Sequence, residues 1–569
     1  MDHGALRRSF LAVVMIGQLA CSAGDAGQGE GSGGASSVGA TGGSGSGGVK
    51  GSGGAVGTGG KAASGGVVGT GGKVASGGTV GSTGGVTAAT GGATVGSGGH
   101  GTAGGTATGG RTASSGGAPS TGGAPSTGGT TGMAGHPGSG GSSNGGSVAP
   151  GTGGAGGAFT GTKTPGTAQS GDITVDPGKT YQVVDGFGEA DVWQNSSSTA
   201  MQTLLFDPVN GIGLTLLRIG IESVSGKSVL MGSAGVADGK ACMMYAGSDC
   251  KVWAAPWSPP ASMKNNNNVN GGASNNTLMT ADYDAWATLL AAFPAYYKQQ
   301  SGVDLYAISA QNEPDFNPTY EACLYDKNQM VSFIKALGPK LAALSPPVKV
   351  LAAEPDNWGN LWGGDSYGPA IIADSTANMY VGPIATHDYG STSAGTYARP
   401  APPSNNTHHV WETECTPNDT GPITIATMIY AAFTTGGVNA WHYWWTQALV
   451  PSASSPPPQV YALGNFSKFV RPGYYRADVS GAPKASGSVP LVVAFTNRTD
   501  ATVVVVVVNG GSAQQASFFV AGTAWPASVT PYVTTTSSKL AAGSPISVTA
   551  GRFSASLAAQ SVTTFVGKP

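Results

Sequence analysis

The chain has 569 residues with a net charge of −2, and only 10% of them are charged, so it lacks the basic face that nucleic-acid binding needs. No apolar run reaches the ~20 residues of a membrane-spanning helix. Glycine accounts for 96 residues, and most of that excess lies before residue 169, which excludes a packed core there.

Residues 1–21 resemble an export signal. Arg7 and Arg8 precede a short apolar stretch, Phe10 to Ile16, and small residues lead to Cys21. The arginine pair also fits a twin-arginine signal. Cys21 is placed like the lipidated cysteine of bacterial lipoproteins, although Gln18 stands where that signal usually has Leu. We therefore expect an extracellular or cell-surface protein, either secreted or held by a lipid anchor at Cys21.

Residues 22–168 are predicted to be a disordered low-complexity linker rich in Gly, Ser and Thr. Between Cys21 and Ile173 the chain has no Leu, Ile, Trp or Tyr, so it cannot bury enough apolar area to offset the entropy of ordering. Its glycines come in pairs without a strict three-residue period, which excludes collagen. A flexible coil of this length spans roughly 70 Å.

Residues 172–470 have the pattern of a (β/α)8 barrel. The eight expected strands are Tyr181 to Phe187, Gly213 to Ile221, Lys251 to Pro256, Leu305 to Ala310, Val348 to Ala353, Ile384 to His387, His409 to Glu414 and Val438 to Trp444. The clearest helical stretches between them are Asp282 to Gln300, Lys327 to Leu344 and Ile423 to Thr434. Strands that alternate with helices predict an α/β fold with a closed parallel sheet.

Residues 471–569 predict an antiparallel β-sandwich side domain, because short β-rich runs there are separated by Gly, Pro and Ser. Residues 172–180 are expected to add a strand to it. Six consecutive valines, Val503 to Val508, predict a strand that is buried on both faces.

Two carboxylates stand at the ends of expected barrel strands. An apolar run beginning at Leu305 ends in Asn312-Glu313-Pro314-Asp315, and a second run, Val410-Trp411-Glu412-Thr413, ends at Glu414. Parallel barrels present catalytic groups at the C-terminal ends of their strands. Two such carboxylates are the minimum equipment for hydrolysing a glycosidic bond.

Four stretches, together with this pair, resemble glycoside hydrolase family 30, and within it the bacterial xylanase-like (glucuronoxylanase) branch. They are Asp185-Gly186-Phe187-Gly188, Ala255-Pro256-Trp257-Ser258-Pro259-Pro260, Ala307 to Asp315, and Phe469-Val470-Arg471-Pro472-Gly473-Tyr474. The resemblance covers residues 172–569. It implies a (β/α)8 barrel with a fused β-sandwich, retaining endo-hydrolysis of a polysaccharide and no cofactor.

The resemblance also implies roles for individual residues. Glu313 matches the general acid/base, and Asn312 would bind the sugar 2-hydroxyl. Glu414 matches the nucleophile, in the family's pattern Trp-any-Thr-Glu. Glu412 is the rival, because residues two apart on a strand face the same way; otherwise it would form an ion pair lower in the barrel. Arg218 is expected beside Glu414, where it would keep that carboxylate ionised.

Further side chains at the expected strand ends are candidates for substrate contacts. Sugar rings stack on aromatic faces. The candidates are Trp257, His387, Tyr389, Trp444 and Trp445, and Glu354 is a weaker candidate for a supporting acceptor. His408 and His409 have no matching ligand set, so no metal is expected.

One departure from the branch bears on the substrate. Glucuronic-acid-dependent xylanases of this branch carry arginine after the Trp-Trp of strand eight, whereas this chain has Trp444-Trp445-Thr446-Gln447 and no Arg or Lys until Lys468. The expected activity is therefore endo-hydrolysis of β-1,4-xylan without dependence on glucuronic acid. The alternatives are a β-1,6-glucanase or exo-β-glycosidase of the same family, or a surface protein that only binds carbohydrate.

Four cysteines besides Cys21 allow three pairings. We expect Cys242–Cys250, which closes a short loop, and Cys323–Cys415, which would tie the loop after Glu313 to the residue after Glu414. The protein is expected to act as a monomer.

Overall fold

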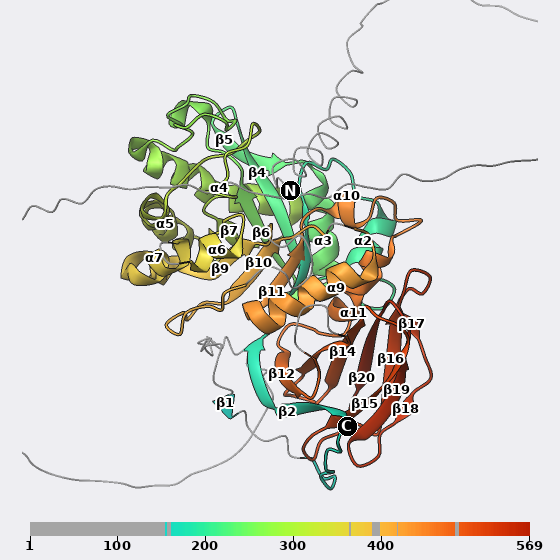
Figure 1. Cartoon of the computed structure of the whole chain (residues 1–569). Helices are drawn as coiled ribbons and strands as arrows, with labels where there is room; N and C mark the ends of the chain where they lie inside the picture. The colour runs from blue at the N-terminus through green and yellow to red at the C-terminus, as the bar shows by residue number, and fades with distance from the viewer. Residues whose placement is uncertain (1–153, 156–160, 364–365, 390–398, 418, 484–488) are drawn as a thin grey trace, which may run out of the picture. The chain divides into compact units, whose positions relative to one another are not determined.

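The structure is a computed structural model that describes residues 154–155, 161–363, 366–389, 399–417, 419–483 and 489–569 (Figure 1). The expected export signal with Cys21, and most of the expected linker, lie outside the described residues. Among the helices of the described part, none combines the length and apolar character that crossing a membrane requires.

Eight parallel strands form a closed barrel, as expected. They are β3 (Gly186–Asp191), β4 (Leu216–Val224), β6 (Lys251–Pro256), β7 (Leu305–Ser309), β8 (Lys349–Ala353), β9 (Val381–His387), β10 (Val410–Glu414) and β11 (Ala440–Tyr443). Neighbours in the barrel follow chain order, and β3 pairs in parallel with both β4 and β11, which closes the sheet. An antiparallel strand, β5 (Lys227–Met231), extends β4 as a hairpin.

The first barrel strand differs from the prediction of Tyr181 to Phe187. That range spans the end of a side-domain strand, which stops at Val183, and the start of β3 at Gly186. Gly186 has φ +141°, a backbone conformation that other residues rarely adopt, so the extended chain breaks there. The other seven strands lie where the sequence predicts them, within a few residues at their ends.

Helices follow most of the barrel strands. They are α2 (Thr199–Phe206), α3 (Ala234–Ala246), α4 (Tyr283–Ser301), α5 (Lys327–Ala342), α6 (Trp358–Trp362), α7 (Tyr367–Ala373), α8 (Ser375–Tyr380), α9 (Pro422–Ala431), α10 (Thr446–Leu449) and α11 (Pro458–Ser467). Local signals explain their ends. A capping box of Asp326 and Gln329 starts α5, and Gly302 ends α4 in the left-handed conformation.

The side domain is one curled sheet, mostly antiparallel. Its strands are β2 (Asp172–Val183), β12 (Tyr475–Ser480), β13 (Leu491–Thr496), β14 (Val503–Asn509), β15 (Gln514–Val520), β16 (Ser528–Thr534), β17 (Ala541–Ala542), β18 (Ile546–Ser547), β19 (Arg552–Leu557) and β20 (Ser561–Gly567). The main path runs β17-β16-β20-β14-β13-β12-β2-β15-β19, and its two halves bury their inner side chains in one core. The strand expected from residues 172–180 is therefore confirmed, as β2.

The valine strand β14 lies between β13 and β20 and is buried on both faces, as predicted. Val503, Val505 and Val507 face the core inside the curled sheet. Val504, Val506 and Val508 belong to the same apolar cluster as the barrel helices. One strand thus joins the side domain to the barrel through alternate side chains.

The C-terminal end of the expected linker contacts the side domain. Lys163 N donates to Thr523 O (3.2 Å), and Lys163 Nζ donates to Trp525 O (2.6 Å) and lies over that indole ring. Upstream, β1 (Gly154–Ala155) pairs with β2. The region that the sequence predicts as a linker up to residue 168 therefore has defined contacts from residue 161 onward.

The cysteines confirm one expected pairing and contradict the other. Cys242 and Cys250 form a disulfide with a Cα–Cα distance of 5.7 Å. Cys323 and Cys415 are buried free thiols, so the predicted bridge between them is wrong. Cys415 Sγ lies 3.9 Å from Met428 Sδ of α9, whereas Cys323 follows β7. Strands β8 and β9 separate β7 from β10 in the barrel, which keeps the two thiols apart.

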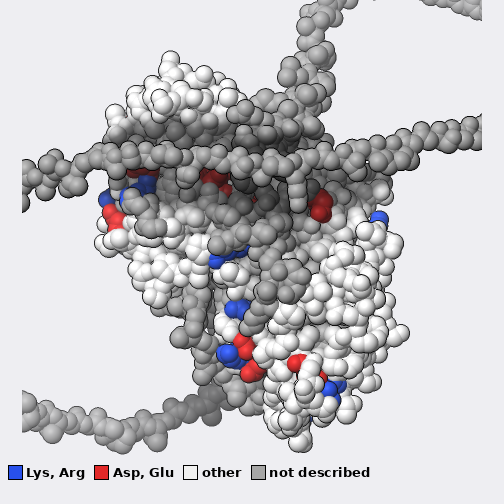
Figure 2. Space-filling model, in the orientation of Figure 1, with Lys and Arg blue, Asp and Glu red and all other residues white. Residues whose placement is uncertain are grey.

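Charged side chains are sparse on the face seen in Figure 2, where positive and negative residues occur in small mixed groups. Several ionisable groups lie inside the protein instead. Arg218, Glu354 and Glu412 are fully buried. Burying a charge costs free energy unless the charge is paired, so these groups need partners inside the protein.

Candidate active site

Glu313 is presented at the C-terminal end of β7 by an unusual backbone. Asn312 N donates to Pro256 O of β6 (3.0 Å), and Glu313 N donates to Glu354 O beyond β8 (3.1 Å). Both Glu313 (φ +45°) and Glu354 (φ +57°) adopt the left-handed region, which costs free energy in residues other than glycine. Hydrogen bonds to the two adjoining strands hold this conformation and turn the carboxyl group toward the barrel axis.

Glu414 ends β10, and a bulge decides which way it faces. The pairing of β10 with β9 shifts register between Glu412 and Glu414. Trp411 packs inside the barrel, and Glu412 lies outside it, 3.3 Å from Trp358 Nε1 of α6. Without the bulge Glu412 and Glu414 would share a face, as the sequence predicts; that expectation is wrong. Glu414 therefore reaches the site alone, and Glu412 Oε2 lies 3.8 Å from Arg399 Nε outside the barrel.

Arg218 of β4 lies at the centre of the site, as expected. Its Nη1 contacts Glu414 Oε2, and its Nη2 lies 2.5 Å from Asn312 Oδ1 and 3.1 Å from Glu354 Oε1. The guanidinium is fully buried. Burial lowers the pKa of Arg218, but Glu354 and then Glu414 outweigh it and raise the pKa. One arginine thus orients both the predicted nucleophile and the predicted 2-hydroxyl ligand.

Tyr389 gives Glu414 its second contact. Its hydroxyl donates to Glu414 Oε1 at 2.5 Å, so the two carboxylate oxygens have different partners, Tyr389 and Arg218. Tyr389 N donates to Asp356 O (3.1 Å), which positions the ring from the adjoining loop.

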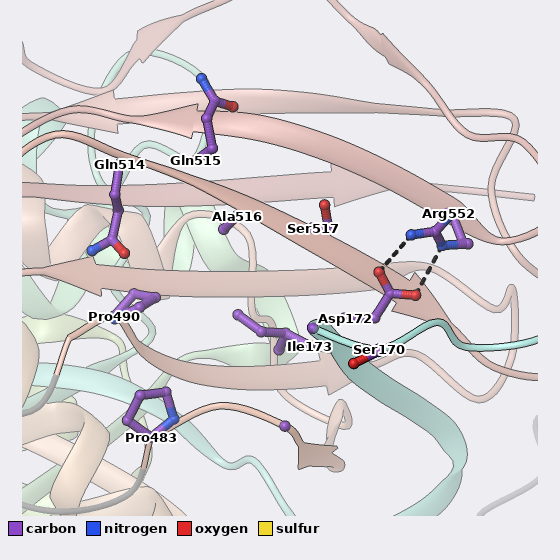
Figure 3. A pocket seen from close by; sticks show the side chains of 12 residues that line it. Ser170, Asp172, Ile173, Pro483, Pro490, Gln514, Gln515, Ala516, Ser517 and Arg552 are labelled. Atoms are coloured by element: carbon purple, nitrogen blue, oxygen red, sulfur yellow. Dashed lines mark hydrogen bonds and ion pairs between the residues drawn. The ribbon is translucent and has the colours of Figure 1, made fainter.

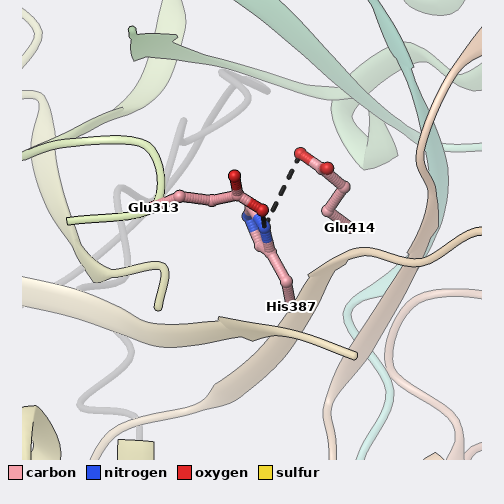
Figure 4. Close-up of side chains that lie close together, drawn as sticks. All are labelled: Glu313, His387 and Glu414. Carbon is pink, nitrogen blue, oxygen red and sulfur yellow. Dashed lines mark hydrogen bonds and ion pairs between the residues drawn. The ribbon is translucent and has the colours of Figure 1, made fainter. Parts of the chain in front are cut away.

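His387, at the end of β9, links the two predicted catalytic carboxylates (Figure 4). Its Nδ1 lies 3.2 Å from Glu313 Oε1 and 3.7 Å from Glu414 Oε2, and its Nε2 lies 3.4 Å from Glu354 Oε1. Burial lowers the pKa of His387, but Glu414, Glu313 and Glu354 outweigh it and raise the pKa to about 9. The ring is therefore an imidazolium at neutral pH.

Glu354 is a buried counter-ion for both cations. Burial raises its pKa, but Arg218 and then His387 overcome that effect and hold the pKa below the ordinary value. The site then contains two cations, Arg218 and His387, and three carboxyl groups.

The separation of Glu313 and Glu414 is the central measurement. One oxygen of each carboxyl group and one ring nitrogen of His387 all lie within 4.8 Å of one another. Both glutamates are buried, with 5% of their surface exposed. This pair meets the geometric condition for two-carboxylate glycoside hydrolysis.

Two trios among the described residues also have spacing that a metal ion could use. They are Glu313, His387 and Glu414, and Asp388, Glu412 and Cys415. In each trio an arginine already contacts a carboxylate, Arg218 in the first and Arg399 in the second. Protein groups thus supply positive charge at both positions. His408 and His409 contact Asn378 and Asp185 respectively.

Tryptophans gather around Arg218, and one of them was missed by sequence reasoning. Trp257 and Trp444 have ring centroids 6.0 Å apart, and Arg218 lies over both. Trp193 completes the group, 5.2 Å from Trp257 and 5.9 Å from Trp444. Its place directly after the first barrel strand was the available signal. Trp445 instead donates its Nε1 to Val192 O (2.9 Å), a contact to the barrel backbone.

A separate pocket of about 410 Å³ lies on the side domain (Figure 3). Its lining includes Asp172 and Arg552, joined by two hydrogen bonds of 2.7 and 2.8 Å, with Gln514, Gln515 and Ser517 alongside. The lining has no aromatic ring and none of the barrel carboxylates. The pocket therefore plays no part in the candidate chemistry.

Comparisons with known proteins agree with the fold and indicate a glycoside hydrolase. The profile of the glycosyl hydrolase family 30 TIM-barrel domain matches residues 240–410. Glucuronoxylanase XynC of Bacillus subtilis (strain 168) is 28% identical over 414 residues, which are 69% of this chain and 91% of that protein.

Solved structures agree as well. The glycoside hydrolase family 30 subfamily 8 xylanase Xyn30A from Clostridium acetobutylicum is 32% identical with a TM-score of 0.59, covering 70% of this chain and 100% of that one. A GH30 endoxylanase from Clostridium papyrosolvens C71 is 31% identical with a TM-score of 0.57 and the same coverage.

Proposed function

We propose, from the premise that this chain belongs to glycosyl hydrolase family 30 and is a glycoside hydrolase, that it cleaves β-1,4-xylan internally with retention of configuration. The observation that carries the proposal is the spacing of Glu313 and Glu414, whose nearest oxygens lie within 4.8 Å. Retaining enzymes hold their carboxyl groups about 5–5.5 Å apart, and inverting enzymes about 6.5–9.5 Å. The short spacing leaves no room for a water between the second carboxylate and the sugar.

In the first step Glu414 attacks the anomeric carbon and Glu313 protonates the departing glycosidic oxygen. The bond from the anomeric carbon to that oxygen breaks, and a glycosyl ester on Glu414 forms. Arg218 and Tyr389 hold the two oxygens of Glu414, which fixes the direction of attack. Asn312, held by Arg218, is directed toward the sugar 2-hydroxyl.

In the second step Glu313 removes a proton from water, and the water oxygen attacks the anomeric carbon. The ester bond breaks and Glu414 leaves as a carboxylate, so the configuration is retained after two inversions. His387 lies between the two carboxyl groups. Its positive charge can therefore stabilise the negative charge on whichever carboxyl group carries it at each step.

The substrate proposal depends on the residues directly after the Trp444-Trp445 pair, which follows β11. Gln447 Nε2 donates to Gln194 Oε1, so a neutral amide pair lies in the stretch after Trp444-Trp445, where the branch carries arginine in its sequence. Lys468 lies elsewhere and donates to Val209 O (2.8 Å) and Gly211 O (3.0 Å) before β4. A sugar carboxylate would lack a bidentate partner here, which favours unsubstituted or neutrally decorated xylan.

We further propose that the enzyme is exported and acts as a monomer outside the cytoplasm, with the linker holding the catalytic part away from an anchor at Cys21. Its partner is the polysaccharide itself. Incorporation of labelled palmitate by the wild-type chain, lost in Cys21→Ala, is the expected result for a lipoprotein. Release of unlabelled protein into the medium would contradict the anchor while leaving export in place.

The test of function is reducing-sugar release on glucuronoxylan, arabinoxylan and unsubstituted linear xylan. We expect comparable rates on all three, with internal cleavage products, and loss of at least about 10³-fold in Glu414→Gln. The β-anomer should appear first in an NMR time course. Asp374→Asn, a carboxylate-to-amide change at the partly exposed N-cap of α8, serves as the control.

The outcomes separate the alternatives. Activity confined to glucuronoxylan would contradict the proposed independence from glucuronic acid. No activity on xylan together with hydrolysis of β-1,6-glucan would identify the enzyme as a β-1,6-glucanase of the same family. Release of single sugars from chain ends would contradict internal cleavage, and first appearance of the α-anomer would contradict retention.

A further inference from the structure

A buried charge cluster lies directly behind the catalytic carboxylates, and the proposed reaction uses none of it. Arg399 Nη2 contacts Asp388 Oδ2, and Arg399 Nε lies 3.8 Å from Glu412 Oε2. Arg399 and Asp388 are 2% exposed, and Glu412 is fully buried. Trp358 of α6 donates to Glu412, and the neighbouring Cys415 contacts α9, so the cluster sits between the barrel and its helices.

Charge accounting shows that Arg399 is the cation of this cluster. Burial and then the charge of Asp388 raise the pKa of Glu412 to about 8, so Glu412 holds a proton at neutral pH. Asp388 then forms the ion pair with Arg399. Burial lowers the pKa of Arg399, but Asp388 and Glu412 outweigh it and raise the pKa. Removing Arg399 would take the positive charge away from two adjoining carboxyl groups in a low-dielectric setting, which is costly.

Asp388, which pairs with Arg399, and its two neighbours in the sequence together make three contacts with the proposed nucleophile, Glu414. Asp388 N donates to Glu414 O (3.0 Å). The residue before it, His387, lies 3.7 Å from Glu414 Oε2, and the residue after it, Tyr389, donates to Glu414 Oε1 at 2.5 Å. The Asp388 side chain points away from the catalytic carboxylate into the cluster, while both neighbouring side chains point toward it.

We propose that Arg399 is a positioning residue for glycoside hydrolysis. Its ion pair with the side chain of Asp388, on the outer side of the barrel, holds Tyr389 and His387 in contact with Glu414. A hydrogen bond of 2.5 Å tolerates little displacement, since such bonds weaken steeply once distance and angle depart from the optimum. Loss of this ion pair should therefore lower the rate of the chemical step more than the affinity for substrate. This inference rests on the proposed role of Glu414 as nucleophile.

A double-mutant cycle tests the connection in the full chain. Arg399→Met should lower kcat on xylo-oligosaccharides about tenfold or more, with KM within about threefold. Arg399→Lys, which keeps the charge without the fork, should recover part of the loss. In a Tyr389→Phe background, Arg399→Met should cost less than about threefold further, because the contact it supports is already gone.

The control is Arg471→Met. Arg471 is partly buried, and its guanidinium donates to backbone carbonyls of Gly213 and Ser467, before β4 and in α11. It should lower the melting temperature and leave kcat per folded enzyme unchanged. Equal losses of kcat in both arginine variants, or full multiplication of the Arg399 and Tyr389 effects, would overturn the proposal.

A crystal structure supplies an arm that needs no activity. In Arg399→Met, or in Arg399→Lys if the first variant does not fold, the distance from Tyr389 Oη to Glu414 should exceed about 3.5 Å, the limit of a hydrogen bond. An unchanged distance overturns the proposal. If the wild-type chain is inactive on xylan, the proposed function fails on that result alone, and this distance still decides the role of Arg399.

Discussion

The hydroxyl of Tyr389 donates a hydrogen bond of 2.5 Å to Oε1 of Glu414, the oxygen that Arg218 does not contact. The carboxylate is thereby held at both oxygens, by Arg218 of β4 and by Tyr389 of the loop after β9. Its remaining freedom is small, which is what an in-line attack on the anomeric carbon requires.

Tyr389→Phe should lower kcat about 10- to 100-fold, since a hydrogen bond to a charged group is worth about 1.5–3 kcal/mol. Steady-state kinetics on xylo-oligosaccharides measures the effect. Tyr306→Phe is the matched control. The Tyr306 ring stacks on Trp411, and among the described contacts its hydroxyl accepts a hydrogen bond only from Lys349, which is not part of the site. Equal losses in the two variants would contradict a specific role for Tyr389.

His387 should make stability depend on alkaline pH. Burial alone would lower its pKa, but three carboxyl groups raise it to about 9 from an ordinary value of 6.5. A raised histidine pKa contributes stability that is complete below about pH 6.5 and is lost as the pH rises through 9. The melting temperature of the wild type should therefore exceed that of His387→Gln at pH 6, and the gap should close by about pH 10. A gap that is the same at both pH values would show that the ring acts through packing.

Glu189 should make stability depend on pH in the acidic to neutral range. It lies on the outer side of β3 within a buried group that includes Asp191 and Asp238, and Thr446 donates to it. Burial and then Asp238 raise the pKa of Glu189 to about 8. A raised carboxyl pKa contributes stability that is present below the unfolded value of 4.5 and is lost as the pH rises through 8.

Glu189→Gln removes that loss, because an amide of the same shape does not ionise. The variant should melt close to the wild type at pH 5 and above it at pH 8.5, as measured by calorimetry. Asp284→Asn, at an exposed carboxylate in α4, is the control, and its difference from the wild type should not change between the two pH values. A variant that melts below the wild type throughout would mean that the ionised carboxylate has partners that stabilise it.

The catalytic pair could be predicted from sequence because Glu313 follows one barrel strand and Glu414 ends another. In a parallel barrel the strands deliver their C-terminal ends to the same rim, so Glu313 and Glu414 meet there, and Arg218 reaches them from the third position of β4. Other contacts depend on details that spacing does not encode. The bulge in β10 turns Glu414 away from the side on which Glu412 lies, and strand order keeps Cys323 from Cys415. Trp193 and Arg399 reach their positions from loops, whose paths depend on packing rather than on periodicity.

Gln447 offers a test of substrate choice by gain of function. Its amide contacts Gln194 beside the tryptophan group, where a guanidinium could instead meet a sugar carboxylate. Gln447→Arg should raise kcat/KM on glucuronoxylan about tenfold relative to linear xylan, as one charge-assisted bidentate contact provides. Gln447→Lys, a point charge without the planar fork, should gain less. Because the new contact is an exposed ion pair, its benefit should shrink at high salt. Equal gains on linear xylan would show that the position acts on the backbone of the polysaccharide and that its neutral amide does not set the preference for decoration.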